Sequence, residues 1–260
     1  MFALERIKII KKYLLENQKA EVAVLSDILD VTEVTIRRDL EKLEHEGFLK
    51  RIHGGAVLAD EPDDSSFHRE WDPLQEERLE IGQIAAHFVD DNDVIMLTQG
   101  PTILQLARSL GEKRNLTILT NDLLIALELT AFPQIKTILL GGDMDTQDRC
   151  VYGNYTVNSL KNFFVAKTFF EVDGVDEEHG FTVSSIEKAR LIQESLNISR
   201  EAVCLCSSDR FGETGFFPVG KLDLASRIVT NSDLEDRFKD MVFEKGIPLF
   251  TSLQVYEGHV

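Results

Sequence analysis

The sequence predicts an α/β protein in two parts: a small helical head that ends in a β-hairpin, and a larger body built on a mostly parallel sheet. Three observations favour this fold class. Apolar residues first recur at helical spacing and then form two short runs around a glycine pair, up to residue 58. An acidic stretch with no apolar period follows, from 59 to 75. Beyond it, short apolar runs alternate with amphipathic stretches, which is typical of strands that alternate with helices.

We therefore predict a head at residues 1–58, a linker at 59–75 and a body at 76–260. With 260 residues, 43% of them hydrophobic, the chain can bury a full core. It contains no apolar run near the roughly 18 residues that a membrane-spanning helix needs. Its first residues, MFALERIKIIKK, do not form a signal peptide. The expected location is the cytoplasm, with no membrane partner.

The head is expected to contain three helices. The first two have apolar residues three or four positions apart: Ile7, Ile10 and Leu14, then Val22, Leu25 and Leu29. Asp30 interrupts the pattern and suits a tight turn, because Asp adopts left-handed backbone more readily than most residues. Thr32 is placed to cap the next helix. Two short helices joined by such a turn form a helix-turn-helix motif, here at about residues 20–39.

The third helix should present arginine to the solvent. At 100° per residue, Ile36, Leu40 and Leu43 fall within about 60° of one another and define the buried stripe. Arg38 lies about 160° from the centre of that stripe, so it is the side chain best placed to enter a DNA groove. Asp39 is expected to brace an arginine.

The sequence after the third helix predicts a basic β-hairpin, which would form a wing. Residues 47–52 and 54–58 form two short strands around a glycine turn. The expected DNA contacts are residues of the third helix and the wing: Thr32, Val34, Thr35, Arg37, Arg38, Lys42, Lys50, Arg51 and His53. Arginine pairs are also common on solvated helix faces, and His53 can instead pack on the turn.

Charge is unevenly divided between the two parts. Residues 1–58 contain ten Lys and Arg and ten Asp and Glu, so the whole net charge of −17 lies after residue 58. Phosphates carry the part of DNA affinity that does not depend on sequence, and they repel an acidic body. The head is therefore expected to make the DNA contact.

Seven apolar runs in the body predict seven strands of a mostly parallel sheet. The apolar runs are Val94–Leu97, Leu116–Leu119, Ile135–Leu140, Thr168–Val172, Ala202–Cys206, Ile228–Thr230 and one near Ile247–Val255. Ligands of such sheets bind at the carboxyl ends of the strands. The residues that follow the first three runs are the candidate effector site: Gly100, Thr102, Thr120, Asn121, Gly141 and Gly142. Glycine lets backbone N–H groups approach an anion, and Thr102 begins a helix whose positive end favours phosphate. A Gly-Gly pair after a strand is also a common turn.

The head motif T-x-x-T-I-R-R-D-L-x-x-L-E-x-x-G-x-L-x-R-x-H-G-G-A, residues 32–56, closely resembles the DeoR family of bacterial transcriptional regulators. The resemblance spans about residues 3–255 and continues in the body at Gly100, Thr102, Leu119-Thr120-Asn121, Gly141-Gly142, Gly153, Asp173-Gly174-Val175-Asp176, Gly180, Glu187-Lys188-Ala189 and Arg210-Phe211-Gly212. It implies that the body is a sensor domain resembling sugar-phosphate isomerases, whose ligand, a phosphorylated sugar or related metabolite, relieves repression. It also implies that Glu187, Lys188 and Arg210 lie near the crevice.

Two segments depart from the family pattern. Residues 98–102, Thr-Gln-Gly-Pro-Thr, stand where members commonly have Asp-Ser-Gly-Thr-Thr, and residues 207–212, Ser-Ser-Asp-Arg-Phe-Gly, stand where they have Asp-Ser-Ser-Lys-Phe-Gly. Carboxylates suit sugar hydroxyls as acceptors, so Thr98 and Ser207 indicate a changed or a lost ligand. Arg210 can still hold a phosphate bidentately.

Other chemistry has little support in the sequence. Cys204 and Cys206 lie two apart in an apolar run and are expected to be buried on one strand face. The six histidines are scattered without helical ligand spacing, so neither a metal site nor a cofactor is expected.

We expect a DNA-binding transcriptional regulator that is not an enzyme, most simply a repressor of a sugar-metabolism operon. Its partners would be double-stranded operator DNA, a small-molecule effector and further copies of itself, as a dimer or tetramer. One alternative is an isomerase-like enzyme, which the missing carboxylates at Thr98 and Ser207 disfavour. The other is a DNA-binding oligomer without an effector, which the same losses favour.

Overall fold

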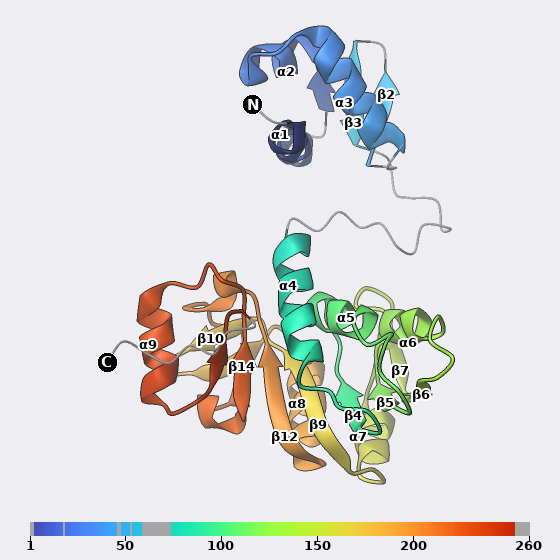
Figure 1. Ribbon diagram of the computed structural model, residues 1–260, viewed down its shortest axis with the longest axis vertical. Helices are drawn as coiled ribbons and strands as arrows, with labels where there is room; N and C mark the ends of the chain where they lie inside the picture. The colour runs from blue at the N-terminus through green and yellow to red at the C-terminus, as the bar shows by residue number, and fades with distance from the viewer. Residues whose placement is uncertain (1–2, 18, 46–47, 53, 59–73, 253–260) are drawn as a thin grey trace. The chain divides into compact units, whose positions relative to one another are not determined.

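A computed structural model describes residues 3–17, 19–45, 48–52, 54–58 and 74–252 (Figure 1). The chain divides into two compact units, Met1–Pro73 and Leu74–Val260, and each has a hydrophobic core of its own. Within the described residues, no helix is both long and apolar enough to cross a membrane.

The first unit contains the three predicted helices and the predicted hairpin. The helices are α1 (Ala3–Asn17), α2 (Val22–Leu29) and α3 (Glu33–His45). The strands are β1 (Lys19–Glu21), β2 (Leu49–Ile52) and β3 (Gly55–Leu58), in the antiparallel order β1-β3-β2. The three-residue strand β1 was not predicted. Asp30 ends α2 with φ 49° and ψ 49°, so the left-handed turn expected of it is confirmed.

The buried stripe of α3 is also confirmed. Ile36, Leu40 and Leu43 are at most 1% exposed, whereas Arg38 on the opposite side is exposed. Asp39 is 8% exposed and does brace an arginine: Arg6 of α1 donates to it from Nε at 2.8 Å and from Nη2 at 3.3 Å. This paired contact fixes α3 against α1 on the side away from Arg38.

The second unit is built on a seven-stranded parallel sheet. Its strands are β4 (Val94–Leu97), β5 (Thr117–Thr120), β6 (Lys136–Leu139), β9 (Val165–Glu171), β12 (Ser199–Leu205), β14 (Arg227–Val229) and β15 (Leu249–Phe250). The order is β15-β14-β12-β9-β4-β5-β6. Every neighbouring pair is parallel. Each of the seven apolar runs overlaps one of these strands, so the predicted α/β fold is confirmed.

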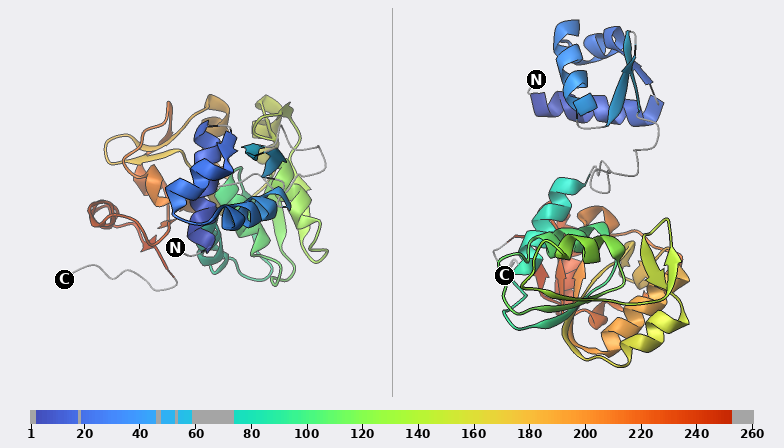
Figure 2. Two further views of the ribbon diagram at one scale, coloured as in Figure 1. Left: turned by 90° about the horizontal axis from the view of Figure 1, so that it is seen from above. Right: turned by 90° about the vertical axis from the view of Figure 1, so that its right-hand side faces the viewer.

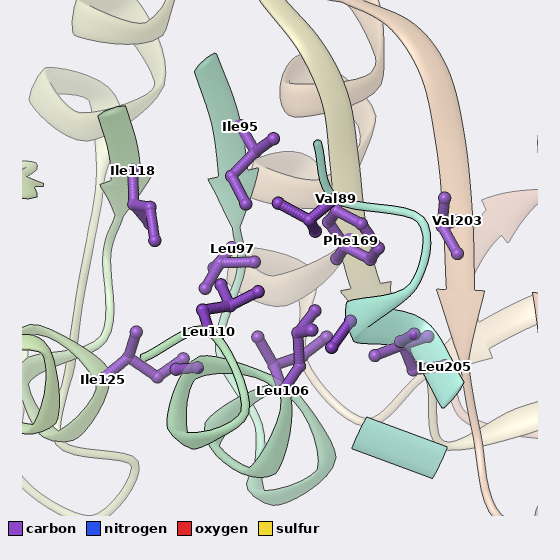
Figure 3. Close-up of a cluster of buried hydrophobic side chains, with 14 of the residues drawn as sticks. Val89, Ile95, Leu97, Leu106, Leu110, Ile118, Ile125, Phe169, Val203 and Leu205 are labelled. Atoms are coloured by element: carbon purple, nitrogen blue, oxygen red, sulfur yellow. The ribbon is translucent and has the colours of Figure 1, made fainter. Parts of the chain in front are cut away.

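Helices cover both faces of this sheet. On one face, α4 (Gln75–Ala86), α5 (Pro101–Arg108) and α6 (Leu123–Leu129) pack on a core that includes Leu97, Phe169 and Val203 (Figure 3). On the other, α7 (Asn154–Leu160), α8 (Ile186–Asn197) and α9 (Asp236–Glu244) contribute to cores that contain Met96 and Phe170. Adjacent residues of a strand thus serve opposite layers, which explains why these strands are apolar without alternation.

Shorter antiparallel elements were not predicted. One is the hairpin of β7 (Asp143–Asp145) and β8 (Cys150–Tyr152), and the other is a small sheet of β10 (Gly174–Asp176), β11 (Gly180–Val183) and β13 (Phe217–Gly220). Single 3-10 turns occur at Ser208–Arg210 and Leu222–Leu224. Strands of three or four residues rich in Gly and Asp carry too little apolar pattern to be detected. Two further views of the second unit are given in Figure 2.

The strand order reverses next to β4. From β4 the chain proceeds to β5 and β6 on one side, and the later strands β9, β12, β14 and β15 lie on the other. In open α/β sheets, the crevice outside the carboxyl ends of the two strands at such a reversal is the usual ligand site. Here that position lies between the ends of β4 and β9.

A pair of substitutions in α3 tests the assignment of its two faces. Replacing Ile36, which is fully buried, with Ala should destabilise the first unit by about 2–5 kcal/mol through lost burial and a cavity. Replacing Val34, which is 62% exposed, with Ala should change its stability by less than about 0.5 kcal/mol. Denaturant unfolding of both variants measures this, and equal losses would contradict the assignment.

Candidate DNA-binding surface and effector crevice

The exposed face of α3 carries cations that differ in their availability. Arg37 donates to Glu33 at 2.9 Å, one helical turn earlier, in an ion pair whose two side chains are largely exposed. Arg38 and Lys42 are exposed, and neither has an ion pair or hydrogen bond with the described residues. Spaced four apart, they lie on the same side of the helix. Arg38 and Lys42 are therefore the cations of α3 most available to DNA.

The start of α3 is polar and open. Thr32 precedes the helix, and its hydroxyl oxygen accepts weakly from Thr35 N–H at 3.4 Å, so the predicted cap is present. The Thr32 and Thr35 hydroxyls lie 3.0 Å apart. Val34 is 62% exposed beside them. This arrangement offers two hydroxyl groups and one apolar side chain at the end of a helix.

The wing is less available than the sequence suggested. Lys50 is exposed on β2. Arg51 is exposed too, but its Nε donates to Glu44 at 2.6 Å and its backbone N–H donates to the same carboxylate at 2.9 Å. The pair joins β2 to the end of α3 and neutralises Arg51. His53, also a candidate DNA contact, lies outside the described residues.

The predicted crevice residues of the body do come together at the carboxyl ends of neighbouring strands. Gly100 and Thr102 follow β4, Thr120 and Asn121 end β5, and Gly141-Gly142 follows β6. These residues differ in exposure, because Thr102, Thr120 and Asn121 are fully buried whereas the glycine pair is exposed. A Cβ at Gly142 would collide with the Thr156 hydroxyl and the Tyr152 carbonyl, so packing alone requires this glycine.

A carboxylate that was not predicted lies at the start of α5. The Glu171 side chain, from the last residue of β9, accepts from Thr102 N–H at 2.8 Å and from the Thr102 hydroxyl at 2.9 Å. Ile103 N–H also donates to it. Gly100 caps the helix with φ 137°, and any Cβ there would collide with the same carboxylate. Glu171 thus occupies the positive end of α5, where the sequence predicted a phosphate.

Burial raises the pKa of Glu171 to about 7, against the lowering effects of the nearby Arg78 charge and of the Thr102 and Ile103 hydrogen bonds. A second carboxylate, Asp122, caps α6 by accepting from Leu124 N–H at 2.7 Å and Ile125 N–H at 3.1 Å. Burial raises the pKa of Asp122 as well. Both carboxylates are therefore held in surroundings that oppose their charge.

The three charged residues that the family resemblance placed near the crevice are all described. Lys188 Nζ lies 3.2 Å from Asp148, and Arg210 Nε lies 3.5 Å from Asp209. Glu187 is exposed on the first turn of α8. Both cations therefore already face carboxylates of this chain.

The two positions that depart from the family pattern use their hydroxyls internally. Thr98, fully buried, donates to the carbonyl of Phe169 at 3.2 Å, and Ser207 donates to Asp209. Each hydroxyl therefore completes a contact within the fold.

Three residues at the crevice were not predicted from the sequence: Gln99, Asp122 and Glu171. Glu171 carried a signal, because it is a charged residue inside an apolar strand run. Gln99 and Asp122 directly adjoin predicted residues. No group of three or more His, Cys, Asp or Glu that could hold a metal ion is found in the described part of the chain.

Two family descriptions match this architecture. The DeoR-like helix-turn-helix domain matches residues 6–62, and the DeoR C terminal sensor domain matches residues 74–232. The chain belongs to the DeoR family. This DeoR-family chain is thus a helix-turn-helix transcriptional regulator with a sensor domain.

Regulators from two bacteria resemble the chain over most of its length. The lactose phosphotransferase system repressor of Staphylococcus epidermidis is 31% identical, over 90% of this chain and 95% of that one. The HTH-type transcriptional repressor GlcR of Bacillus subtilis is 26% identical over 98% of each. Among solved structures, ribose 5-phosphate isomerase A of Methanocaldococcus jannaschii is similar with a TM-score of 0.40 and 16% identity, over 53% of this chain and 55% of that one.

Because the pKa of Glu171 is raised, we predict that the stability of the body depends on pH. Because the pKa of Glu171 is raised in the folded state from its ordinary value of 4.5, its stabilising contribution is complete below about pH 4.5 and is lost as the pH rises through about 7. Glu171→Gln should remove this dependence and stabilise the body at pH 8, relative to wild type, by on the order of 1–3 kcal/mol.

Chemical unfolding of wild type and Glu171→Gln at pH 5.5, 7 and 8 measures this difference. Asp122 titrates in both proteins and cancels in the comparison. A difference between the two proteins that does not grow with pH would contradict the buried environment of Glu171.

Proposed function

We propose that this DeoR-family regulator is a repressor of a carbohydrate-metabolism operon and that a sugar-derived metabolite, such as a phosphorylated sugar, relieves repression. In this proposal residues 1–58 bind double-stranded operator DNA, 59–75 link the two units, and 76–260 bind the effector. The proposal gives the chain no catalytic activity. The observation that carries it is the exposed face of α3, where Arg38 and Lys42 lack partners among the described residues.

Charge supports the DNA-binding role of the first unit. All of the net −17 lies after residue 58, so the body repels phosphates while the near-neutral head presents its cations on α3 and β2. A helix of 13 residues that is apolar on one side and presents the cations Arg38 and Lys42, unpaired among the described residues, on the other has the form that enters a major groove. Arg38 would then contact a guanine edge or a phosphate, and Lys42 and Lys50 would contact phosphates.

Two kinds of support point to a sugar-derived effector. The relatives from S. epidermidis and B. subtilis are named as repressors, and the name of the first refers to a lactose phosphotransferase system. The body also has the strand reversal at which α/β sheets bind small ligands.

The mechanism requires more than one copy of the chain. Helix-turn-helix proteins bind paired half-sites as symmetric oligomers, so we propose that this chain acts as a dimer or tetramer. An effector that binds one arrangement of the oligomer better than the other then shifts the population away from the DNA-bound form. Repression is relieved by that difference in affinity.

Arg38 is the first residue to test. Arg38→Ala should weaken specific DNA binding by about 1–3 kcal/mol if Arg38 reads a base, whereas Arg37→Ala should cost less, because Arg37 is already paired with Glu33. The probe is a duplex selected from a random-sequence pool with the full-length protein, and affinities are measured over a range of salt concentrations. Lys12→Ala, which removes an exposed cation of α1, is the matched control.

Unchanged affinity and an unchanged salt slope in Arg38→Ala would exclude Arg38 from the interface. Equal losses in Arg38→Ala and Lys12→Ala would show a general charge effect instead of a contact made by α3.

The effector role is tested with a panel of free sugars, polyols and their phosphates. At least one compound should raise the melting temperature of the body and lower affinity for the selected duplex, since a ligand stabilises the state that it binds. Differential scanning fluorimetry and DNA-binding titrations measure the two effects. If no compound changes either quantity, the effector part of the proposal is wrong and a regulator without an effector is favoured.

A further inference from the structure

The end of α5 is already closed by an anion of the protein itself. From Gly100 to Leu104, every backbone N–H has a partner. Gly100 N–H donates to Asp122 at 3.4 Å, and Pro101 has no N–H. Thr102 and Ile103 donate to Glu171, and Leu104 donates within the helix to the Gly100 carbonyl. A phosphate at this helix end would have to displace Glu171 from at least two donors.

The position of Glu171 follows from the sheet. In the pairing of β4 with β9, Leu97 lies opposite Phe169. Two residues further along each strand, Gln99 and Glu171 are therefore neighbours at the carboxyl edge, on either side of the point where the strand order reverses. The carboxylate thus lies where this class of sheet binds its ligand.

Arg78 is a cation near this position, but its charge already acts on Glu171, and the other charged groups disfavour an incoming phosphate. Two carboxylates, Asp122 and Glu171, accept from the loop that follows β4. The cations Lys188 and Arg210, which the family resemblance associates with the crevice, each face a carboxylate of this chain. A phosphate would meet repulsion here without gaining an unpaired cation from either residue.

The crevice has unused acceptors. Gln99 Oε1 and Asn121 Oδ1 are both buried and have no hydrogen-bond partner among the described residues, and the two residues are at most 6% exposed. Gln99 lies two residues after the end of β4, and Asn121 directly follows β5 at the same edge of the sheet. A buried acceptor without a donor costs free energy, and a ligand hydroxyl can supply that donor.

We propose that Glu171 is the determinant of effector specificity: it fills the anion position of α5, so the effector presents hydroxyl groups, and not a phosphate, to this end of the crevice. The ligand class is a polyhydroxy compound, bound here by Glu171 and by the side-chain amides of Gln99 and Asn121. The choice of ligand rests on the proposed effector role of the body, whereas the closure of α5 stands on the contacts of Glu171 alone.

The first experiment titrates the full-length protein with inorganic phosphate at pH 8, against chloride at matched ionic strength, by calorimetry and melting temperature. Wild type should show no saturable phosphate binding at the crevice. Glu171→Ala, which frees the donors of Thr102 and Ile103, should gain binding that is tighter by about tenfold or more. Phosphate bound by the head is common to all variants and cancels in the comparison.

Two controls locate the gained site. Adding Thr102→Val to Glu171→Ala removes one donor at α5 and should weaken the gained binding, and Glu244→Ala, which removes an exposed carboxylate of α9, should gain nothing. If Glu171→Ala does not fold, Glu171→Gln replaces it, because it removes the charge and keeps the size. A smaller gain is then expected.

Three results would overturn the closure of α5: equal phosphate binding by wild type and Glu171→Ala, no gain in either Glu171 variant that folds, or a gain that Thr102→Val leaves unchanged.

The second experiment uses any compound from the sugar panel that releases DNA. Glu171→Ala should weaken the binding of that compound by about tenfold or more. Unchanged binding would overturn the specificity role. A panel without any active compound would instead refute the effector function, while the phosphate titration still decides the state of α5.

Discussion

The contact between Glu171 and the first turn of α5 is the interaction on which the geometry of the candidate effector site depends. It connects two segments 69 residues apart, the end of β9 and the loop after β4, at the point where the strand order reverses. Gly100 must lack a side chain for the carboxylate to approach, and burial raises the pKa of Glu171 to about 7. The fold therefore holds a half-buried carboxylate, in surroundings that oppose its charge, at the position where an α/β sheet usually receives a ligand.

Because of the division of charge, only a few cations of the DNA-binding unit are available to contact DNA. The head is neutral overall, and several of its basic residues are used for internal structure: Arg6 fixes α3 through Asp39, and Arg51 fixes β2 through Glu44. With the acidic body unable to contribute attraction, phosphate contacts fall to the few cations that remain unpaired. Arg38 is therefore important for DNA binding both because it lies on the exposed face of α3 and because few other cations in the described part of the head are unpaired.

Sequence patterns predicted the elements whose signal is local or continuous. The inner strands of the sheet, β4, β5, β9 and β12, are largely buried and therefore appear as apolar runs, and α3 shows its buried stripe through the spacing of Ile36 and Leu40. Short antiparallel strands such as β1 and β7 have no comparable signal. Glu171 was part of a predicted strand, but its partner depends on which strand lies beside β9 and in which register. Spacing along the chain does not contain that information, so the sequence predicted a phosphate at the start of α5, where the structure places the Glu171 carboxylate.

The same contact gives the crevice a short physical connection to the beginning of the body. Arg78 of α4 interacts electrostatically with Glu171, and α4 packs so closely on α5 that a Cβ at Gly82 would collide with the backbone of Gln105. Helix α4 begins at Gln75, where the predicted linker of residues 59–75 ends. A ligand that changes the partners or the charge of Glu171 therefore changes the forces on both helices between the crevice and the linker. If the proposed effector acts at Glu171, α4 and α5 are the packed elements through which it would act on the linker.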